Sequence, residues 1–214
     1  MGSPMRNKMH YTYRIAGICA LLLGSVLPSF SQEGWRFTLR PEESEFTVKV
    51  GRAGFLKVFG HDHLVEIRGF NGEVNWQPEQ PEASSIRIEV QAASLTVVGE
   101  DEEERAQIQA DMEAKALEVE SYPQILFVSE ELSLGDAEGG EYRGRVTGQI
   151  TLRGVTNTVT IPLTLTVREQ SLRAQGEFQI KGSDFGVEQI SVAGGTVKTS
   201  DDLELTFDLV GVRE

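Results

Sequence analysis

The sequence is almost free of cysteine. Its single thiol, Cys19, lies in an apolar run near the N-terminus. If that run is removed, the rest of the chain can form no disulfide, so packing and hydrogen bonding alone must hold the fold together. Long apolar runs are scarce as well. The run at residues 15–27 is shorter than the roughly 20 residues that a membrane-spanning helix needs, and no later stretch approaches it.

The first 31 residues have the pattern of a secretory signal peptide. Three basic residues precede the apolar run, and Ser29-Phe30-Ser31 puts small residues where a signal peptidase requires them. We therefore predict a signal peptide at residues 1–31 and a mature domain at residues 32–214, located in the periplasm or secreted. An uncleaved membrane anchor is the alternative, although the run is short for one. After cleavage we expect no segment that spans a membrane.

Positive charge is also in short supply. The chain has 20 basic and 33 acidic residues, and three of the basic ones precede residue 32, which leaves the predicted mature domain with a formal charge of −16. Such a charge repels phosphate backbones and anionic membrane surfaces, so it argues against nucleic acid as a partner. No internal repeat or linker divides the remaining residues, whose length suits one domain with a sizeable core. The sequence leaves both a monomer and a homodimer open.

The motifs of several enzyme classes are absent. The sequence has no G-x-S-x-G elbow, no H-E-x-x-H motif and no phosphate-binding glycine loop, and the predicted mature domain has no cysteine nucleophile. Only two histidines follow residue 31, and a single residue separates them, which gives a Ser-His-Asp arrangement little to build on. We therefore expect a protein that is not an enzyme and uses no cofactor.

What the sequence does contain is alternation of apolar and polar residues. It is clearest at residues 146–152 and 159–167, on either side of a connection at residues 154–157. A period of two sends neighbouring side chains to opposite faces, so this segment predicts a long antiparallel hairpin with one buried face. Shorter stretches of the same kind begin at Phe46, Ile86, Ile125, Leu172 and Leu203. About eight strands are thus predicted, which favours an all-β sandwich or an up-and-down barrel.

One segment departs from the period of two. Acidic residues at 99–104 lead into residues 106–117, where Ile108, Met112 and Ala116 recur at helical spacing. Acidic side chains in a first turn stabilise a helix through its dipole, so we predict one helix with a solvated start. A calcium site is the alternative interpretation of the acidic run, but its oxygen ligands do not follow the EF-hand spacing.

The two histidines beyond residue 31, His61 and His63, share the parity of Val65 and Ile67 on one predicted strand. If the apolar residues face inward, both imidazoles do so too. They are then either half of a zinc or copper site or polar groups at the rim of a cavity, and no third metal ligand stands at a diagnostic spacing. The apolar parity changes at Gly69, as expected for a β-bulge.

Four segments in order resemble the YceI-like family. They are residues 60–76 (GHDHLVEIRGFNGEVNW), 121–127 (SYPQILF), 148–156 (GQITLRGVT) and 183–187 (SDFGV). The resemblance covers roughly residues 35–212. It implies an extended, antiparallel, lipocalin-like barrel of eight strands, closed in part by one short helix, in a periplasmic or secreted protein. It also implies an apolar tunnel that holds an isoprenoid chain, such as a polyprenyl phosphate or a quinone.

This resemblance would turn the inward faces of the strands into the wall of a tunnel. The residues we expect to contact ligand are Phe46, Val48, His61, His63, Val65, Phe127, Ile150, Leu163 and Phe178. The predicted function is a non-catalytic protein that stores or transports an amphipathic isoprenoid lipid. One alternative is a zinc- or copper-binding protein that uses His61 and His63, a pair that many members of the family lack. A second alternative is an interaction sandwich with a filled core.

Overall fold

The computed structural model describes residues 2, 34–53, 62–192 and 197–214. Contacts divide the chain into two compact units, Met1–Ser31 and Gln32–Glu214, and the fold described below is that of the second unit. Apart from Gly2, the predicted signal peptide lies outside the described residues, so it stays a prediction.

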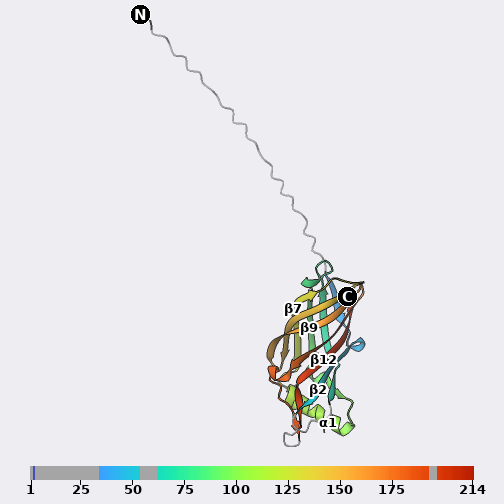
Figure 1. Ribbon diagram of the computed structural model, residues 1–214, viewed down its shortest axis with the longest axis vertical. Helices are drawn as coiled ribbons and strands as arrows, with labels where there is room; N and C mark the ends of the chain where they lie inside the picture. Colours follow the sequence, from blue (N-terminus) through green and yellow to red (C-terminus); the bar gives the residue numbers. More distant parts are fainter. Residues whose placement is uncertain (1, 3–33, 54–61, 193–196) are drawn as a thin grey trace. The chain divides into compact units, whose positions relative to one another are not determined.

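Antiparallel strands make up most of the described chain (Figure 1). They are β1 (Trp35–Leu39), β2 (Glu45–Ala53), β3 (His63–Ile67), β4 (Phe70–Trp76), β5 (Ser85–Gln91), β6 (Leu95–Val98), β7 (Gln124–Leu134), β8 (Glu141–Leu152), β9 (Val155–Val167), β10 (Ser171–Lys181), β11 (Ser191–Val192) and β12 (Val197–Arg213). A helix, α1 (Glu102–Asp111), continues into a π-helical turn, η5 (Met112–Leu117). The short 3-10 turns are η1 (Pro41–Glu43), η3 (Pro81–Ala83), η4 (Ala92–Ser94) and η6 (Gly182–Phe185).

Eight strands form a closed ring. Hydrogen-bonded neighbours follow the order β1-β4-β5-β7-β8-β9-β10-β12, and β12 returns to β1, where Phe37 lies opposite Arg213. The earlier part of β12 pairs instead with β2, and the ladder continues from β2 through β3 to β6. Three positions in the barrel wall are therefore each occupied by two shorter strands with a break between them: β1 and β2, β3 and β4, and β5 and β6. The predicted eight-stranded barrel is confirmed, and the closed ring excludes the two-sheet sandwich.

The parity change at Gly69 is confirmed, although its form differs from the predicted bulge. Val65 and Ile67 are buried on β3, and after two residues outside the ladder the buried set begins again at Phe70. The strand is therefore broken at this point. The break faces η4 on the neighbouring wall, where the Ser94 hydroxyl accepts a hydrogen bond from Gly69 N at 3.0 Å and donates one to Gly69 O.

The predicted hairpin is β8 and β9, but its turn is shorter than expected. Arg153 and Gly154 alone connect the strands, with φ of 51° and 72°, as a two-residue hairpin turn of type I′ requires. Residues 155–157, assigned to the connection from sequence, belong to β9 and pair with β8. Contacts of the Arg153 side chain with Glu118 and with Gly186 O stabilise this uncommon position for arginine.

The helix begins as predicted and closes a gap in the wall. Asp101 accepts a hydrogen bond from Glu104 N at 3.0 Å and caps α1. On its other side β6 pairs with no strand among the described residues, and Gln109 of α1 takes that place. Its Oε1 accepts from Val97 N at 2.9 Å, and its Nε2 donates to Leu95 O at 2.8 Å. Among the described residues, no helix has both the length and the apolar character needed to cross a bilayer.

The ladder between β9 and β10 is short. These strands pair only where residues 164–167 face residues 172–175. The next residue of β9 that would donate to β10 in this register is Pro162, which has no amide hydrogen, so the ladder ends there. Beyond it η6 contacts both strands: Asn157 Nδ2 donates to Asp184 O at 2.7 Å, and Phe185 is buried.

The end of the barrel at β1 is solidly packed, and we call it the packed end. Phe37 and Trp76 are 0% and 2% exposed, and the Trp76 ring meets Tyr142 edge-on with 5.2 Å between centroids. Outside, the Arg213 guanidinium lies 4.6 Å from the centre of the Trp35 ring. The chain therefore seals this end with aromatic side chains, and α1 lies at the opposite end (Figure 1).

Candidate ligand-binding cavity

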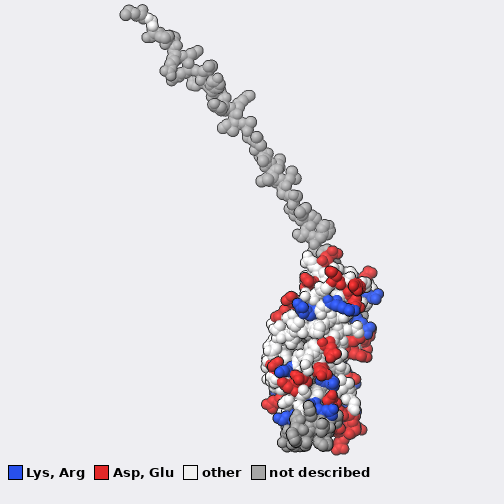
Figure 2. Space-filling model, viewed as in Figure 1, with Lys and Arg blue, Asp and Glu red and all other residues white. Residues whose placement is uncertain are grey.

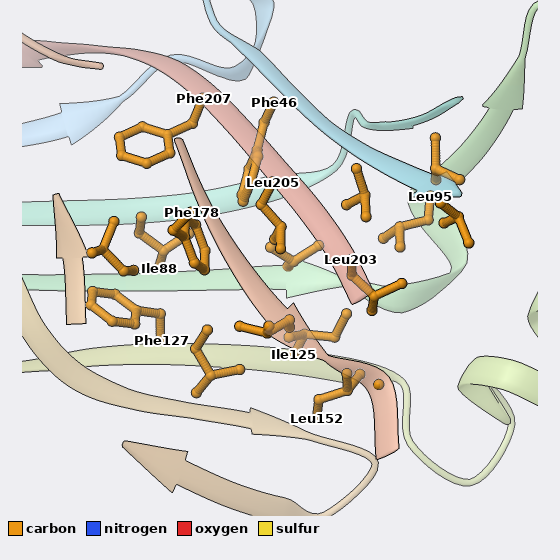
Figure 3. A pocket seen from close by; sticks show the side chains of 18 of the residues that line it. Phe46, Ile88, Leu95, Ile125, Phe127, Leu152, Phe178, Leu203, Leu205 and Phe207 are labelled. Carbon is orange, nitrogen blue, oxygen red and sulfur yellow. The ribbon is translucent and has the colours of Figure 1, made fainter. Parts of the chain in front are cut away.

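Between the packed end and the helix the barrel is hollow (Figure 3). The cavity has a volume of about 240 Å³. A single water molecule needs only about 10–15 Å³ of such space, so the hollow is far larger than a packing defect. Every wall of the barrel and the helix contribute side chains to it.

Two glycines help to keep the cavity open. Gly148 of β8 and Gly176 of β10 lie under the rings of Phe127 and Phe207, which come from the neighbouring strands. A Cβ atom at Gly148 would lie 2.8 Å from the Phe127 ring, and one at Gly176 would lie 2.6 Å from the Phe207 ring. Because no Cβ is present, each ring can lie against the wall instead of projecting across the hollow.

The structure places eight of the nine predicted site residues on the cavity wall. They are Phe46, Val48, His63, Val65, Phe127, Ile150, Leu163 and Phe178. The ninth, His61, lies outside the described residues. Figure 3 shows Phe46, Phe178 and Phe207 close together, and the Phe207 ring meets Phe46 and Phe178 edge-on at centroid distances of 6.4 Å and 6.3 Å. Contact between these residues and a ligand stays a prediction.

The helix supplies a part of the wall that the strand pattern does not include. Ile108, Met112, Ala116 and Leu117 all line the cavity. The first three recur four residues apart, a spacing visible in the sequence, but the period alone does not say what the apolar side of a helix faces. The π-helical turn at Met112–Leu117 ends at Glu118, whose backbone is left-handed with φ of 49°.

Polar residues border the cavity at the helix end, although nearly all of the surface that lines it is apolar. Six described residues form what we call the polar rim: His63, Glu188, Gln189, Thr199, Ser200 and Asp201. They come from three separate segments. The ladders bring these together, because His63 lies opposite Val50 and Val50 lies opposite Leu203 of β12. Apart from His63, sequence reasoning missed this group, since its members are far apart in the chain and form no motif.

Hydrogen bonds hold the loop after η6 against β12 at the rim. Gln189 Nε2 donates to Thr199 O at 2.9 Å, and Ile190 N donates to Thr199 Oγ1 at 3.0 Å. The Asp201 carboxylate accepts from both the backbone N and the hydroxyl of Ser183 at 2.8 Å. These two bonds, the hydroxyl's first, lower the pKa of Asp201, so it is charged at neutral pH.

His63 is paired with an acidic residue that precedes α1. Its Nδ1 lies 2.9 Å from Glu100 Oε1, and the Glu100 side chain is only 9% exposed. Within the described residues, no group of three or more His, Cys, Asp or Glu side chains is arranged to hold a metal ion. That set includes the acidic run considered for calcium. The zinc or copper alternative also involves His61, which lies outside the described residues.

The fold and the cavity define a lipocalin-like class of protein, an antiparallel β-barrel around an apolar hollow. Within that class the chain belongs to the YceI-like family, because the family model of the YceI-like domain matches residues 37–211.

Curated relatives span the same length. A UPF0312 protein of Pseudomonas putida (strain W619) is 28% identical over 204 residues, which cover 91% of this chain and 96% of the relative. A UPF0312 protein of Pseudomonas syringae pv. syringae is 27% identical over 207 residues, with 92% and 97% covered. The similarity thus extends over nearly the whole of each protein.

Solved structures show the same fold at low sequence identity. Burkholderia cenocepacia BcnA has a TM-score of 0.62 and 22% identity, covering 80% of this chain and 98% of its own. A polyisoprenoid binding domain from Saccharophagus degradans has a TM-score of 0.61 and 13% identity, with 83% and 98% covered. These two neighbours support the barrel architecture.

Proposed function

We propose that this protein binds an isoprenoid lipid in its cavity and stores or transports it without catalysing a reaction. The observation that carries the proposal is the distribution of polarity on the wall, where the polar rim is confined to one end and the rest of the lining is apolar. An elongated apolar chain with one polar head has the same distribution. The polyisoprenoid-binding neighbour from Saccharophagus degradans supports this choice of ligand.

The energetics favour a carrier for an apolar chain. Burying each CH₂ group contributes about 0.8 kcal/mol, so ten carbons contribute on the order of 8 kcal/mol and longer tails contribute more. The ordering of ligand and side chains subtracts several kcal/mol from that total. Micromolar affinity corresponds to about 8 kcal/mol, so a tail of isoprenoid length reaches this range without a specific polar contact.

The proposal includes export. A basic segment, an apolar run and small residues precede position 32, as in a secretory signal peptide. The ligand would then be loaded in the periplasm or outside the cell, where a free isoprenoid chain is poorly soluble and needs a protein to shield it.

Native mass spectrometry of the protein purified from its own host tests the proposal. We expect an additional bound mass of several hundred daltons that organic solvent releases and that fragments as an isoprenoid. The same preparation, once delipidated, should take up added geranylgeraniol or a quinone with an isoprenoid tail. A bare polypeptide mass that takes up none of these probes would refute lipid binding, and an increment the size of a metal ion would favour the alternative.

A further inference from the structure

The cavity is closed at the packed end, where the barrel changes abruptly from hollow to filled. The lining residues nearest to this end on β1, β4, β9 and β10 form what we call the floor: Leu39, Val74, Leu165 and Leu172. The next inward position lies about 7 Å further along a strand. On β1 it is Phe37 and on β4 it is Trp76, and both rings are buried without lining the cavity. A molecule inside the barrel therefore meets a closed bottom at the floor.

Leu39 is held in place by the two strands that pair with β1. Each carries a glycine beside it, Gly72 on β4 and Gly211 on β12. A Cβ atom at Gly72 would overlap Leu39 Cδ1, and one at Gly211 would lie 3.4 Å from Leu39 Cδ2. The Leu39 methyl groups thus lie over the backbones of both neighbours, and Phe37 follows on the same face of β1. A larger side chain at position 39 gains room only toward the hollow.

The floor suits the end of an apolar tail and not a polar head. Its four side chains contain no polar atom, and each is at most 4% exposed. Figure 2 shows acidic and basic side chains at this end of the barrel, but they lie on the outer surface. A polar head on the floor would lose its hydrogen bonds to water without replacement, which costs free energy. An amphipathic lipid in this cavity therefore has its tail end at the floor.

From this geometry we infer that the floor, and Leu39 in particular, sets the length of the isoprenoid tail that the protein binds most tightly. The inference rests on the proposed function and names a determinant of its ligand preference. Each added isoprene unit buries more apolar surface until the end of the tail meets the floor. A longer tail must keep its extra carbons outside the cavity or displace Phe37 and Trp76, so the added length no longer raises affinity.

One side chain at the floor is comparable in size to one isoprene unit. An extended chain advances about 1.2 Å per covalent bond, so an isoprene unit, with four bonds along the chain, spans about 5 Å. An indole ring at position 39 would extend about three bonds, or about 3.6 Å, beyond the leucine methyl groups. Leu39→Trp should therefore shorten the preferred tail by about one unit, and Leu39→Ala should shift the preference toward longer tails.

The test uses the full-length protein, delipidated, and a series of all-trans prenols from geraniol upward that differ only in the number of isoprene units. Each prenol is titrated by displacement of a fluorescent fatty probe. We expect wild-type affinity to rise with each unit and then to level off or fall. Leu39→Trp should bind the prenol that the wild type prefers at least about tenfold more weakly, and a prenol one unit shorter within about threefold of the wild type. Leu39→Ala, with the opposite shift, tests the inference if the larger ring prevents folding.

A matched control puts the same ring near the other end of the cavity. Ile180 lines the cavity on β10 and lies opposite Leu203, so Ile180→Trp narrows the cavity without raising the floor. It should weaken the binding of all prenols and leave the preferred length unchanged. Equal shifts of the preferred length in Ile180→Trp and Leu39→Trp would show that total volume, and not the floor, sets the length.

Two further outcomes would overturn the inference while lipid binding stands. One is an unchanged preferred length in the Leu39 variants, and the other is a wild-type affinity that keeps rising along the whole series. If no prenol binds to the wild type, the proposed function itself fails.

Discussion

The packed end and the cavity are built from the same strands but differ in the residues that point inward. At the packed end, Phe37 and Trp76 fill the space completely and are almost inaccessible. Along the cavity the inward positions carry Val48 and Ala174, and two glycines let aromatic rings lie flat. The comparison teaches that strand number closes this barrel, whereas side-chain size decides which part of it is hollow.

Replacing one phenylalanine at each end gives the largest expected effect. Phe37→Ala should lower the free energy of unfolding by about 3–5 kcal/mol, because it opens a void in a filled core. Phe178→Ala removes the same atoms from a wall that already borders empty space, so it should cost less than about 2 kcal/mol. Urea unfolding of both variants measures the difference. Equal losses would mean that the two ends are packed alike.

Filling the cavity should separate ligand binding from stability. Ile150 lines the cavity, whereas its neighbour Gln149 is exposed on the outer face of β8. Ile150→Trp should weaken lipid binding at least about tenfold and change stability by less than the roughly 1–3 kcal/mol that overpacking a filled core costs. Gln149→Trp is the matched control and should leave both unchanged. A loss of several kcal/mol in Ile150→Trp would indicate a solid core at this position.

Breaking the contact between α1 and β6 should have an intermediate effect on the free energy of unfolding. Gln109→Ala removes the side chain that bonds Val97 N and Leu95 O, and it should lower the free energy of unfolding by about 1–2 kcal/mol. Hydrogen exchange at Val97 should speed up while exchange at the packed end stays slow. Gln107→Ala, on an exposed position of the same helix, is the control. Unchanged protection of Val97 in Gln109→Ala would contradict this role of Gln109.

Replacing the histidine pair should weaken lipid binding and leave zinc binding unchanged. We expect the double variant His61→Ala/His63→Ala to lose several-fold in affinity for an isoprenoid alcohol, because the polar rim loses His63. Zinc titration by calorimetry should give the same result for the wild type and the variant. Tight zinc binding that only the wild type shows, and that acid abolishes because metal binds neutral imidazole, would revive the metal alternative.

The smallest expected effect is an acid-dependent one on the outer face. The Arg173 guanidinium donates two hydrogen bonds to Asp208, and these bonds are the main reason that the pKa of this carboxyl is lowered. A lowered native pKa gives stability that is present above about pH 4, the unfolded value, and lost as pH falls through the native value. Asp208→Asn should remove less than about 1 kcal/mol at pH 7, and the loss should shrink as pH falls below about 4. Acid titration of urea unfolding checks the sign, and a loss that persists at low pH would contradict it.

Much of the wall could be predicted from the sequence, because a period of two identifies which residues face inward. Ile150 and Leu163 were placed correctly for this reason. The short strands β1 and β6, with five and four residues, were missed because so few positions do not establish a period. The turn at Arg153 was misplaced, since arginine at positive φ depends on contacts with Glu118 and Gly186 that are distant in the chain.

The period of two could not predict which segments of the barrel are hollow and which are filled. The parity of a residue shows which face of its strand it occupies, but not which residues lie across the barrel from it. The polar rim has the same limitation, because Glu188 and Asp201 lie on loop and strand segments that join only when the ladders form. Of its members, His63 alone was found from the sequence, through the apolar residues that follow it on β3.

Closure of the ring has a consequence for the order of events during folding. The ladder between β1 and β12 joins Phe37 to Arg213 and Thr38 to Val212, so it needs residues from nearly the whole length of the chain. Contacts of such separation form slowly, because a long loop must be closed before any energy is gained. The β8–β9 hairpin, with its two-residue turn, requires no such search and can form within microseconds. We therefore expect synthesis and translocation to be nearly complete before the barrel can close, with the hairpin as the first part of it to form.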